Sequence, residues 1–327
     1  MKLLKRNSLA TCAQCIRNRA FSSKPTSPSI APIKQVLEHG TEYGTHTDYF
    51  GKLPKKKIIV EFSSPNIAKQ FHVGHYRSTL IGHVISNLLR SAGHDVVRVN
   101  YLGDWGLQFA YVYLGYRAKF THAESYEEKL NTVADMSACY VEGCKNFDNE
   151  EALKVFEAME RDDLNLTRFW SHCRRVSVKE YEEFYERLGV NFDEYSGESL
   201  YRNGAGVIRK EHGDVVERGE GESLQVEVSG SRYVEGAKMH PGKISLSRRD
   251  GTSLYLTRDV VALVERHEKY RFDEMIYVTD SSQKPHFCNV FAAVEALGHD
   301  FAAFDRRKLR HVGFGRVRGM KSREGKV

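Results

Sequence analysis

Two histidines, His72 and His75, flank a valine and a glycine at the point where a strand pattern gives way to a helix pattern. Imidazole N–H groups at the N-terminus of a helix suit a phosphate, because the helix end adds its own positive dipole. Gly74 lets the adenine or ribose of a nucleotide approach the backbone. Such a site needs no protein nucleophile: it holds a phosphate in line with an attacking carboxylate and neutralises the charge that grows in the transition state. Two histidines at this spacing are also compatible with a helix cap or a metal site, so their surroundings must decide.

The elements around the histidines predict one βαβ unit. Residues 57–62 have a buried-strand pattern that stops at Ser63, and residues 74–92 carry an apolar stripe at helical spacing, closed by Gly93. A second strand pattern covers 96–102 and ends in Gly103-Asp104-Trp105-Gly106. Ligands of such units lie at the carboxyl ends of the strands, which is where the histidines stand.

The rest of the chain continues this alternation after a long interruption. Residues 121–189 are charged and helical, and residues 194–247 are glycine-rich with short strand patterns. Alternating order then resumes in four elements, which we place at residues 257–270 (helix), 274–278 (strand), 284–297 (helix) and 310–314 (strand). We therefore predict an α/β fold: a doubly wound, Rossmann-like parallel-sheet catalytic domain in two halves, 55–119 and 247–327, separated by a mainly helical insertion at 120–246.

Five further stretches, taken in order, resemble the class I arginyl-tRNA synthetase family across residues 61–325. They are Glu61–Lys69, Arg77–Thr79, Asn100–Gly106, Phe192–Ser199 and Asp250–Tyr255. The fourth looks closest to the mitochondrial members. The resemblance implies a HIGH-type nucleotidyltransferase fold and arginine–tRNA ligase activity.

By this resemblance His72 and His75 are the histidines of the HIGH motif, which bind ATP and stabilise its transferred phosphate. Gly319–Arg323 is similar to the second family motif, KMSKS, with Lys321 present and an arginine in place of the last lysine. Family members with that degeneracy use the lysine before the first motif, and Lys69 occupies its place. The implied ATP-binding set is His72, Gly74, His75, Gly103, Asp104, Met320 and Lys321.

The resemblance also implies an arginine pocket. Its members are Glu61, Ser64, Pro65, Asn66, His75, Tyr255, Asp259 and Gln283, with Asp259 and Glu61 taking the guanidinium. A guanidinium is planar and always charged, so carboxylates match it best. Tyr255 and Asp259 stand four apart at the start of a helix and can face one ligand. The alternative is that Asp259 is an ordinary acid in a first helical turn, where the helix dipole favours it.

The implied reaction consumes L-arginine and ATP, with Mg²⁺ carried by the phosphates, and delivers arginine to tRNA(Arg). We expect a monomer, and we expect the chain to be cut short after the KMSKS-like loop, with residues 22–54 a linker and remnant of an N-terminal tRNA-binding domain. Two alternatives stay open: a non-catalytic fragment that binds arginine or tRNA, and a HIGH-type enzyme acting on a small molecule.

The composition of the N-terminal residues predicts where in the cell the protein is located. Met1 to Val36 holds seven basic residues and no acid, and Arg19-Ala20-Phe21-Ser22 is similar to sites cut by matrix peptidases. We therefore expect a presequence at 1–21 and a mitochondrial matrix location, with a cytoplasmic one as the alternative. No apolar run approaches the roughly 20 residues needed to cross a bilayer, so we expect no membrane partner. The six cysteines lack the spacing of a zinc site, and no metal site is expected.

Overall fold

The computed structural model describes residues 31–40, 54–120, 125–228, 232–234, 237–239, 241–302 and 308–315. The chain divides into two units, 1–52 and 53–327. In the first, helix α2 (Ala31–His39) is described. The expected presequence and the KMSKS-like loop, including Met320 and Lys321, lie outside the described residues.

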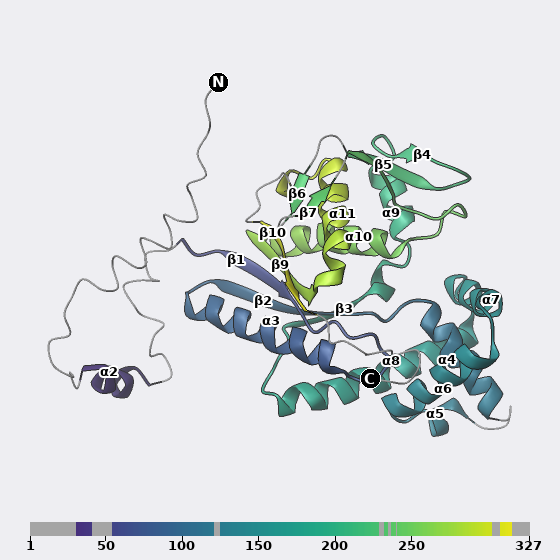
Figure 1. Ribbon diagram of the computed structural model, residues 1–327, viewed down its shortest axis with the longest axis horizontal. Helices are drawn as coiled ribbons and strands as arrows, with labels where there is room; N and C mark the ends of the chain where they lie inside the picture. Colours follow the sequence, from purple (N-terminus) through teal and green to yellow (C-terminus); the bar gives the residue numbers. More distant parts are fainter. Residues whose placement is uncertain are drawn as a thin grey trace. The chain divides into compact units, whose positions relative to one another are not determined.

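The second unit is built on a five-stranded parallel sheet in the order β10-β9-β1-β2-β3 (Figure 1). The strands are β1 (Lys57–Glu61), β2 (Asp95–Leu102), β3 (Glu194–Gly197), β9 (Glu274–Asp280) and β10 (Leu309–Phe314). The predicted doubly wound parallel sheet is thus confirmed. One strand was not expected in it: β3 comes from the middle of the stretch predicted as an insertion and pairs with β2.

Helices cover both faces of the sheet, because alternate side chains of each strand point to opposite faces. Ile58 and Val60 belong to one apolar cluster, together with residues of the helical insertion, whereas Ile59 belongs to the other. On the first face lies α3 (Val73–Ser91), and on the second lie α10 (Tyr255–Tyr270) and α11 (Lys284–Ala296) (Figure 1). Helix α3 approaches β1 very closely, since a Cβ built at Gly82 would lie 2.2 Å from the Cβ of Phe62.

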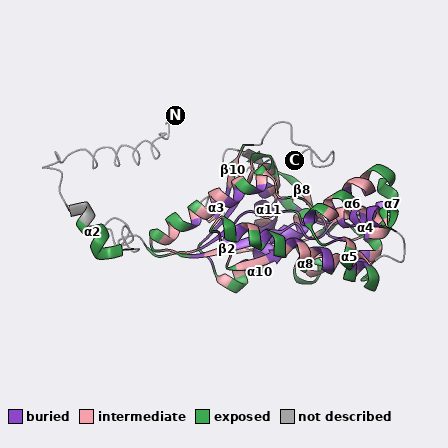
Figure 2. Cartoon of the chain, turned by 90° about the horizontal axis from the view of Figure 1, so that it is seen from below, coloured by how far each residue is buried: buried purple, intermediate pink, exposed green. Residues whose placement is uncertain are grey.

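Five helices lie between β2 and β3. They are α4 (Leu107–Lys119), α5 (Tyr126–Lys129), α6 (Val133–Asn146), α7 (Asn149–Glu160) and α8 (Leu164–Arg187). The first, α4, ends the predicted first half of the domain, and the other four form the helical part of the predicted insertion. Helices α4 and α6 touch backbone to backbone: a Cβ at Gly115 would lie 1.9 Å from the carbonyl oxygen of Cys139. Figure 2 shows the buried residues gathered along the sheet and between these helices. The insertion is therefore packed by its own core, which is continuous with one face of the sheet.

Short elements connect β3 to α10. They are η2 (Glu198–Tyr201), α9 (Gly204–Glu211), an antiparallel sheet of β4 (Glu217–Arg218), β5 (Leu224–Val228) and β8 (Gly242–Ser245), and a pair formed by β6 (Arg232–Val234) and β7 (Ala237–Met239). Further along lie η3 (Ser281–Gln283) and η4 (Asp300–Ala302). Within the described ranges, no helix combines the length and apolar character needed to cross a membrane.

Candidate active site

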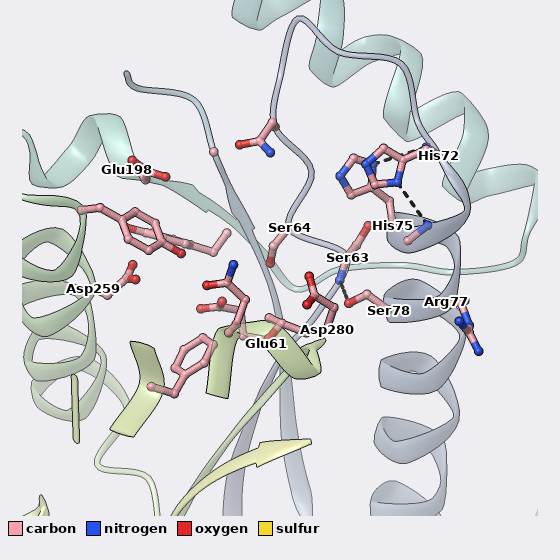
Figure 3. A pocket seen from close by; sticks show the side chains of 18 of the residues that line it. Glu61, Ser63, Ser64, His72, His75, Arg77, Ser78, Glu198, Asp259 and Asp280 are labelled. Atoms are coloured by element: carbon pink, nitrogen blue, oxygen red, sulfur yellow. Dashed lines mark hydrogen bonds between the residues drawn. The ribbon is translucent and has the colours of Figure 1, made fainter. Parts of the chain in front are cut away.

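A cavity of about 760 Å³ opens at the carboxyl ends of all five strands (Figure 3). Each strand contributes a residue at or just after its end: Glu61, Gly103, Glu198, Asp280 and Phe314. The cavity brings together most of the residues that the sequence singled out. These are Glu61, Ser64, Asn66, His72, Gly74, His75, Gly103, Tyr255, Asp259 and Gln283.

The segment between β1 and α3 has an unusual backbone. Ser63, Ser64 and Ala68 all have positive φ, at 69°, 45° and 60°, a conformation that residues other than glycine seldom adopt. Two hydrogen bonds, one buried and one partly buried, hold it. The Ser63 N–H donates to the Ser78 hydroxyl at 2.9 Å, and the Ser64 N–H donates to the side-chain oxygen of Asn100 at 3.1 Å. Strain of this kind is typical of functional sites, where surrounding contacts maintain it.

Helix α8 supplies a second set of bonds to the same segment, through three side chains that we call the α8 clamp: Ser177, Tyr181 and Tyr185. The Tyr185 hydroxyl lies 2.7 Å from the hydroxyl of Ser63. The Tyr181 hydroxyl donates to the Lys69 carbonyl at 2.5 Å, and the Ser177 hydroxyl accepts the N–H of Ala68 at 3.1 Å. A helix of the insertion therefore sets the shape of the loop that leads to the two histidines.

The two imidazoles stack on each other at the start of α3. Their ring centres are 3.7 Å apart and the rings are nearly parallel (Figure 3). His72 is the N-cap, and its Nδ1 accepts the N–H of Gly74 at 3.1 Å; Nδ1 of His75 accepts the N–H of His72 at 3.4 Å. A Cβ at Gly74 would lie 2.9 Å from the His72 ring, which explains the glycine between them.

These contacts fix the proton positions of both histidines. Because each Nδ1 accepts a backbone N–H, the neutral ring carries its proton on Nε2. Burial lowers the pKa of His75 well below its usual value, with the positive charges of His72 and Lys69 adding to the effect. Burial also lowers the pKa of His72. Near neutral pH the pair thus presents two uncharged Nε2–H donors beside a helix N-terminus.

Three carboxylates stand across the cavity from the histidines, and we call them the acidic wall: Glu61, Glu198 and Asp259 (Figure 3). Each meets an internal partner. The guanidinium of Arg266 donates to Glu61 at 2.5 Å, that of Arg258 donates to Glu198 at 2.9 Å, and Nε2 of His286 lies 2.6 Å from Asp259.

Burial changes the ionisation of the acidic wall. It raises the pKa of Glu61 to about 7, although Arg266 opposes the shift. It raises the pKa of Glu198 to about 8, against the attraction of Arg258, and the negative charge of Asp259 raises both values further. Grouped carboxylates in a partly dry cavity resist ionisation unless a cation joins them. The acidic wall is therefore suited to a positively charged ligand.

Three of the residues implied by the resemblance lie away from the cavity surface: Pro65, Lys69 and Asp104. Asp104 is fully buried, and its carboxylate accepts hydrogen bonds from Arg174 at 2.8 Å and from the Ser199 N–H at 2.8 Å. These bonds tie the end of β2 to α8 and η2. The ammonium group of Lys69 lies 4.8 Å from the centre of the Tyr140 ring, and its positive charge helps to lower the pKa of His75.

Other residues of the site had received no role from the sequence. Glu198 stands within the stretch 192–199 that carried the resemblance, so its position was noticed but its carboxylate was not assigned. Arg266 and His286 gave no local signal, because only the fold brings them to Glu61 and Asp259.

Comparison with known proteins agrees with this geometry. Residues 33–327 match the family model described as tRNA synthetases class I (R), catalytic domain. The chain is 43% identical over 304 residues to a probable mitochondrial arginine–tRNA ligase of Bos taurus and 42% identical over 304 residues to that of Homo sapiens. Each alignment covers 90% of this chain and 50% of the relative, so the chain spans about half the length of these curated relatives.

A solved structure is similar as well. The crystal structure of arginyl-tRNA synthetase from Plasmodium falciparum aligns with a TM-score of 0.64 at 29% identity, covering 80% of this chain and 43% of that one. Fold, cavity and sequence thus point the same way, and the chain belongs to the class I tRNA synthetase family, in its arginine-type catalytic domain.

Proposed function

We propose that this chain carries the amino-acid-activating site of an arginine–tRNA ligase. In the proposed reaction the carboxylate of L-arginine attacks the α-phosphate of ATP, pyrophosphate leaves, and arginyl-adenylate forms. The arginyl group then passes to the terminal ribose of tRNA(Arg). The observation that carries the proposal is the placement of the acidic wall opposite the paired histidines within one cavity.

Arginine fits the acidic wall by charge. Its guanidinium would lie against the carboxylates of Asp259 and Glu61. Burial raises the pKa of Glu61, and a cation beside Glu61 would stabilise its ionised form. Ser64, Asn66, Tyr255 and Gln283 line the same cavity and would hold the rest of the amino acid. A pocket built from buried charged groups rejects ligands that leave those groups unpaired.

ATP fits the opposite side. The uncharged Nε2–H groups of His72 and His75 would donate to phosphate oxygens and stabilise the charge that develops as pyrophosphate leaves. Gly74 and Gly103 would leave room for the nucleoside. We propose that Lys69 and Lys321 add positive charge near the phosphates, and that Met320 contacts the nucleotide.

Magnesium would enter with the nucleotide. In the part of the chain that the structure describes, no group of three or more His, Cys, Asp or Glu side chains could hold a metal. A Mg²⁺ ion bound to the ATP phosphates would neutralise part of their charge, and we therefore treat the ion as part of the substrate.

The proposal extends to partners and location. We propose that the protein acts as a monomer on tRNA(Arg) in the mitochondrial matrix. Support for the location comes from the acid-free basic stretch before Glu38 and from the mitochondrial relatives.

Removing one carboxylate tests the site. In Asp259→Asn the guanidinium loses a charged partner in a buried place, which costs about 3 to 5 kcal/mol. We expect the arginine affinity to fall by about 10²- to 10³-fold or more, while ATP binds nearly as before. Isothermal titration calorimetry with each ligand measures both affinities.

The matched control is Asp214→Asn, which makes the same change at an exposed aspartate outside the cavity. It should leave both affinities unchanged. Incorporation of labelled pyrophosphate into ATP, with and without tRNA(Arg), then separates the alternatives. Strong exchange that needs neither arginine nor tRNA would point to a small-molecule nucleotidyltransferase, and normal arginine binding by Asp259→Asn would show that the pocket is misassigned.

A further inference from the structure

Two of the three carboxylates of the acidic wall pair with arginines, and the third, Asp259, pairs with His286. His286 lies in the first turn of α11, and its Nε2 lies 2.6 Å from Oδ2 of Asp259, the fifth residue of α10. Both groups are nearly buried, with side-chain exposures of 14% and 9%. A short bond between two buried groups on two rigid helices fixes the orientation of the carboxylate.

Aromatic neighbours fix the imidazole in turn. Its ring centre lies 4.4 Å from that of Tyr255 and 5.3 Å from that of Phe287, and both of these residues line the cavity. With one face against Tyr255 and an edge toward Phe287, the imidazole has little freedom to turn. Its hydrogen bond therefore leaves Asp259 one preferred rotamer, with the second carboxylate oxygen available to a ligand.

The choice of histidine at this place has a physical consequence. Arg266 and Arg258 bring a permanent positive charge to Glu61 and Glu198. An imidazole can donate the same kind of hydrogen bond without carrying a charge. Asp259 is thus held in place by a partner that is not a permanent cation.

We propose that His286 is a positioning residue for amino-acid specificity: it orients Asp259 toward the guanidinium of the substrate without placing a permanent positive charge beside it. This inference rests on the proposed function, since it assumes that arginine binds at the acidic wall. A change at His286 should therefore alter how strongly the site prefers arginine to other amino acids and should leave ATP affinity unchanged.

Substitutions at His286 that keep or remove the hydrogen-bond donor test this role. His286→Gln retains an N–H donor near the position of Nε2, His286→Met has similar length without a donor, and His286→Phe keeps the ring without a donor. Calorimetry on the full chain compares L-arginine with L-citrulline, in which a neutral urea group replaces the guanidinium. Loss of one buried hydrogen bond to a charged group predicts that His286→Met and His286→Phe bind arginine about 10-fold more weakly. Citrulline affinity should change little, so the ratio of arginine affinity to citrulline affinity should fall in both variants. In His286→Gln this ratio should return most of the way to that of the unaltered chain.

If His286 had a purely structural role, its substitution would weaken the binding of arginine, citrulline and ATP alike. An unchanged ratio of arginine affinity to citrulline affinity therefore overturns the inference. Tighter arginine binding without the donor also overturns it, because His286 would then be competing with the substrate for Asp259. His299→Phe, at a half-buried histidine outside the cavity, controls for the general effect of losing an imidazole. If the unaltered chain itself does not prefer arginine to citrulline, the proposed function fails and this inference fails with it. If that preference is present and survives in His286→Met, only the inference fails.

Discussion

At the scale of single residues, the site keeps carboxylates in a place where they ionise poorly. Glu61 is 4% exposed and Glu198 is 8% exposed, and burial holds both pKa values far above those of carboxylates in water. Internal arginines reduce this cost but do not remove it. The free site is therefore partly protonated at neutral pH, and a bound cation must change that.

We predict that arginine binding releases protons near pH 7. A guanidinium beside the acidic wall stabilises the ionised carboxylates and lowers their pKa values from about 7 and about 8. Since ligand binding expels protons, linkage requires that arginine affinity rises as pH increases from about 6 to 8. Calorimetric titrations at pH 7 in buffers of different ionisation enthalpy give the number of protons released.

Glu198→Gln should release fewer protons, because one of the two titrating groups is gone. Binding enthalpies that do not depend on the buffer would contradict the prediction.

The stability of the free protein should change with pH in the opposite direction to the arginine affinity. Both folded pKa values lie above the usual carboxylate value, so these groups contribute less stability as pH rises from about 4.5 to 8.

Residue types and spacing were enough to predict that His72 and His75 lie together at a helix N-terminus. His72, Gly74 and His75 are close in sequence, and a helix N-terminus fixes their geometry locally. The internal partners could not be found in this way. Arg266 and Glu61 are 205 residues apart in the chain, and their pairing depends on how α10 packs on the sheet.

At the scale of elements, α3 and β1 are fitted together at one glycine. A Cβ at Gly82 would lie 2.2 Å from both Cβ and Cγ of Phe62, whose side chain is fully buried. Because α3 begins with the two histidines and β1 ends with Glu61, this contact sets the distance between the two sides of the cavity.

We predict that Gly82→Ala destabilises the fold. In an exposed helix position, alanine would be favoured over glycine by about 1 kcal/mol. Here overpacking against Phe62 should reverse the sign and lower the free energy of unfolding by about 1 to 3 kcal/mol. Urea denaturation followed by circular dichroism measures the change. Val84→Ala, on the exposed side of the same helix, should change it by less than about 0.5 kcal/mol, and a gain in stability for Gly82→Ala would refute the close fit.

Most elements of the sheet domain could be predicted from hydrophobic periodicity. The strand and helix patterns at 57–62, 74–92, 96–102, 257–270, 274–278, 284–297 and 310–314 all correspond to observed elements within two residues. Strand β3 was assigned to the insertion because it is only four residues long and follows a long helical stretch. Its place beside β2 is set by pairing over a long chain separation, which no local pattern reveals.

At the scale of the whole molecule, the N-terminal stretch makes a prediction about processing. Basic, acid-free and serine-rich composition is typical of matrix-targeting segments, and the similarity to a peptidase site at Arg19–Ser22 indicates cleavage after Phe21. N-terminal sequencing of the protein isolated from mitochondria should find a first residue at or within a few positions of Ser22. An intact Met1 on protein recovered from the cytosol would argue for the cytoplasmic alternative.

The α8 clamp bears on how far this catalytic domain can be made smaller. Helices α4 to α8 look like a module that protein engineers could excise, since they follow one another in the chain between β2 and β3. Excision would also remove the hydroxyls that hold Ser63, Ala68 and the Lys69 carbonyl. Left-handed backbone at non-glycine residues costs about 1 to 3 kcal/mol each, and in the shortened chain the bonds to Ser78 and Asn100 would have to offset it without the clamp. A minimised synthetase would then need glycines at positions 63, 64 and 68, or a new helix in place of α8, before its histidines could face a phosphate.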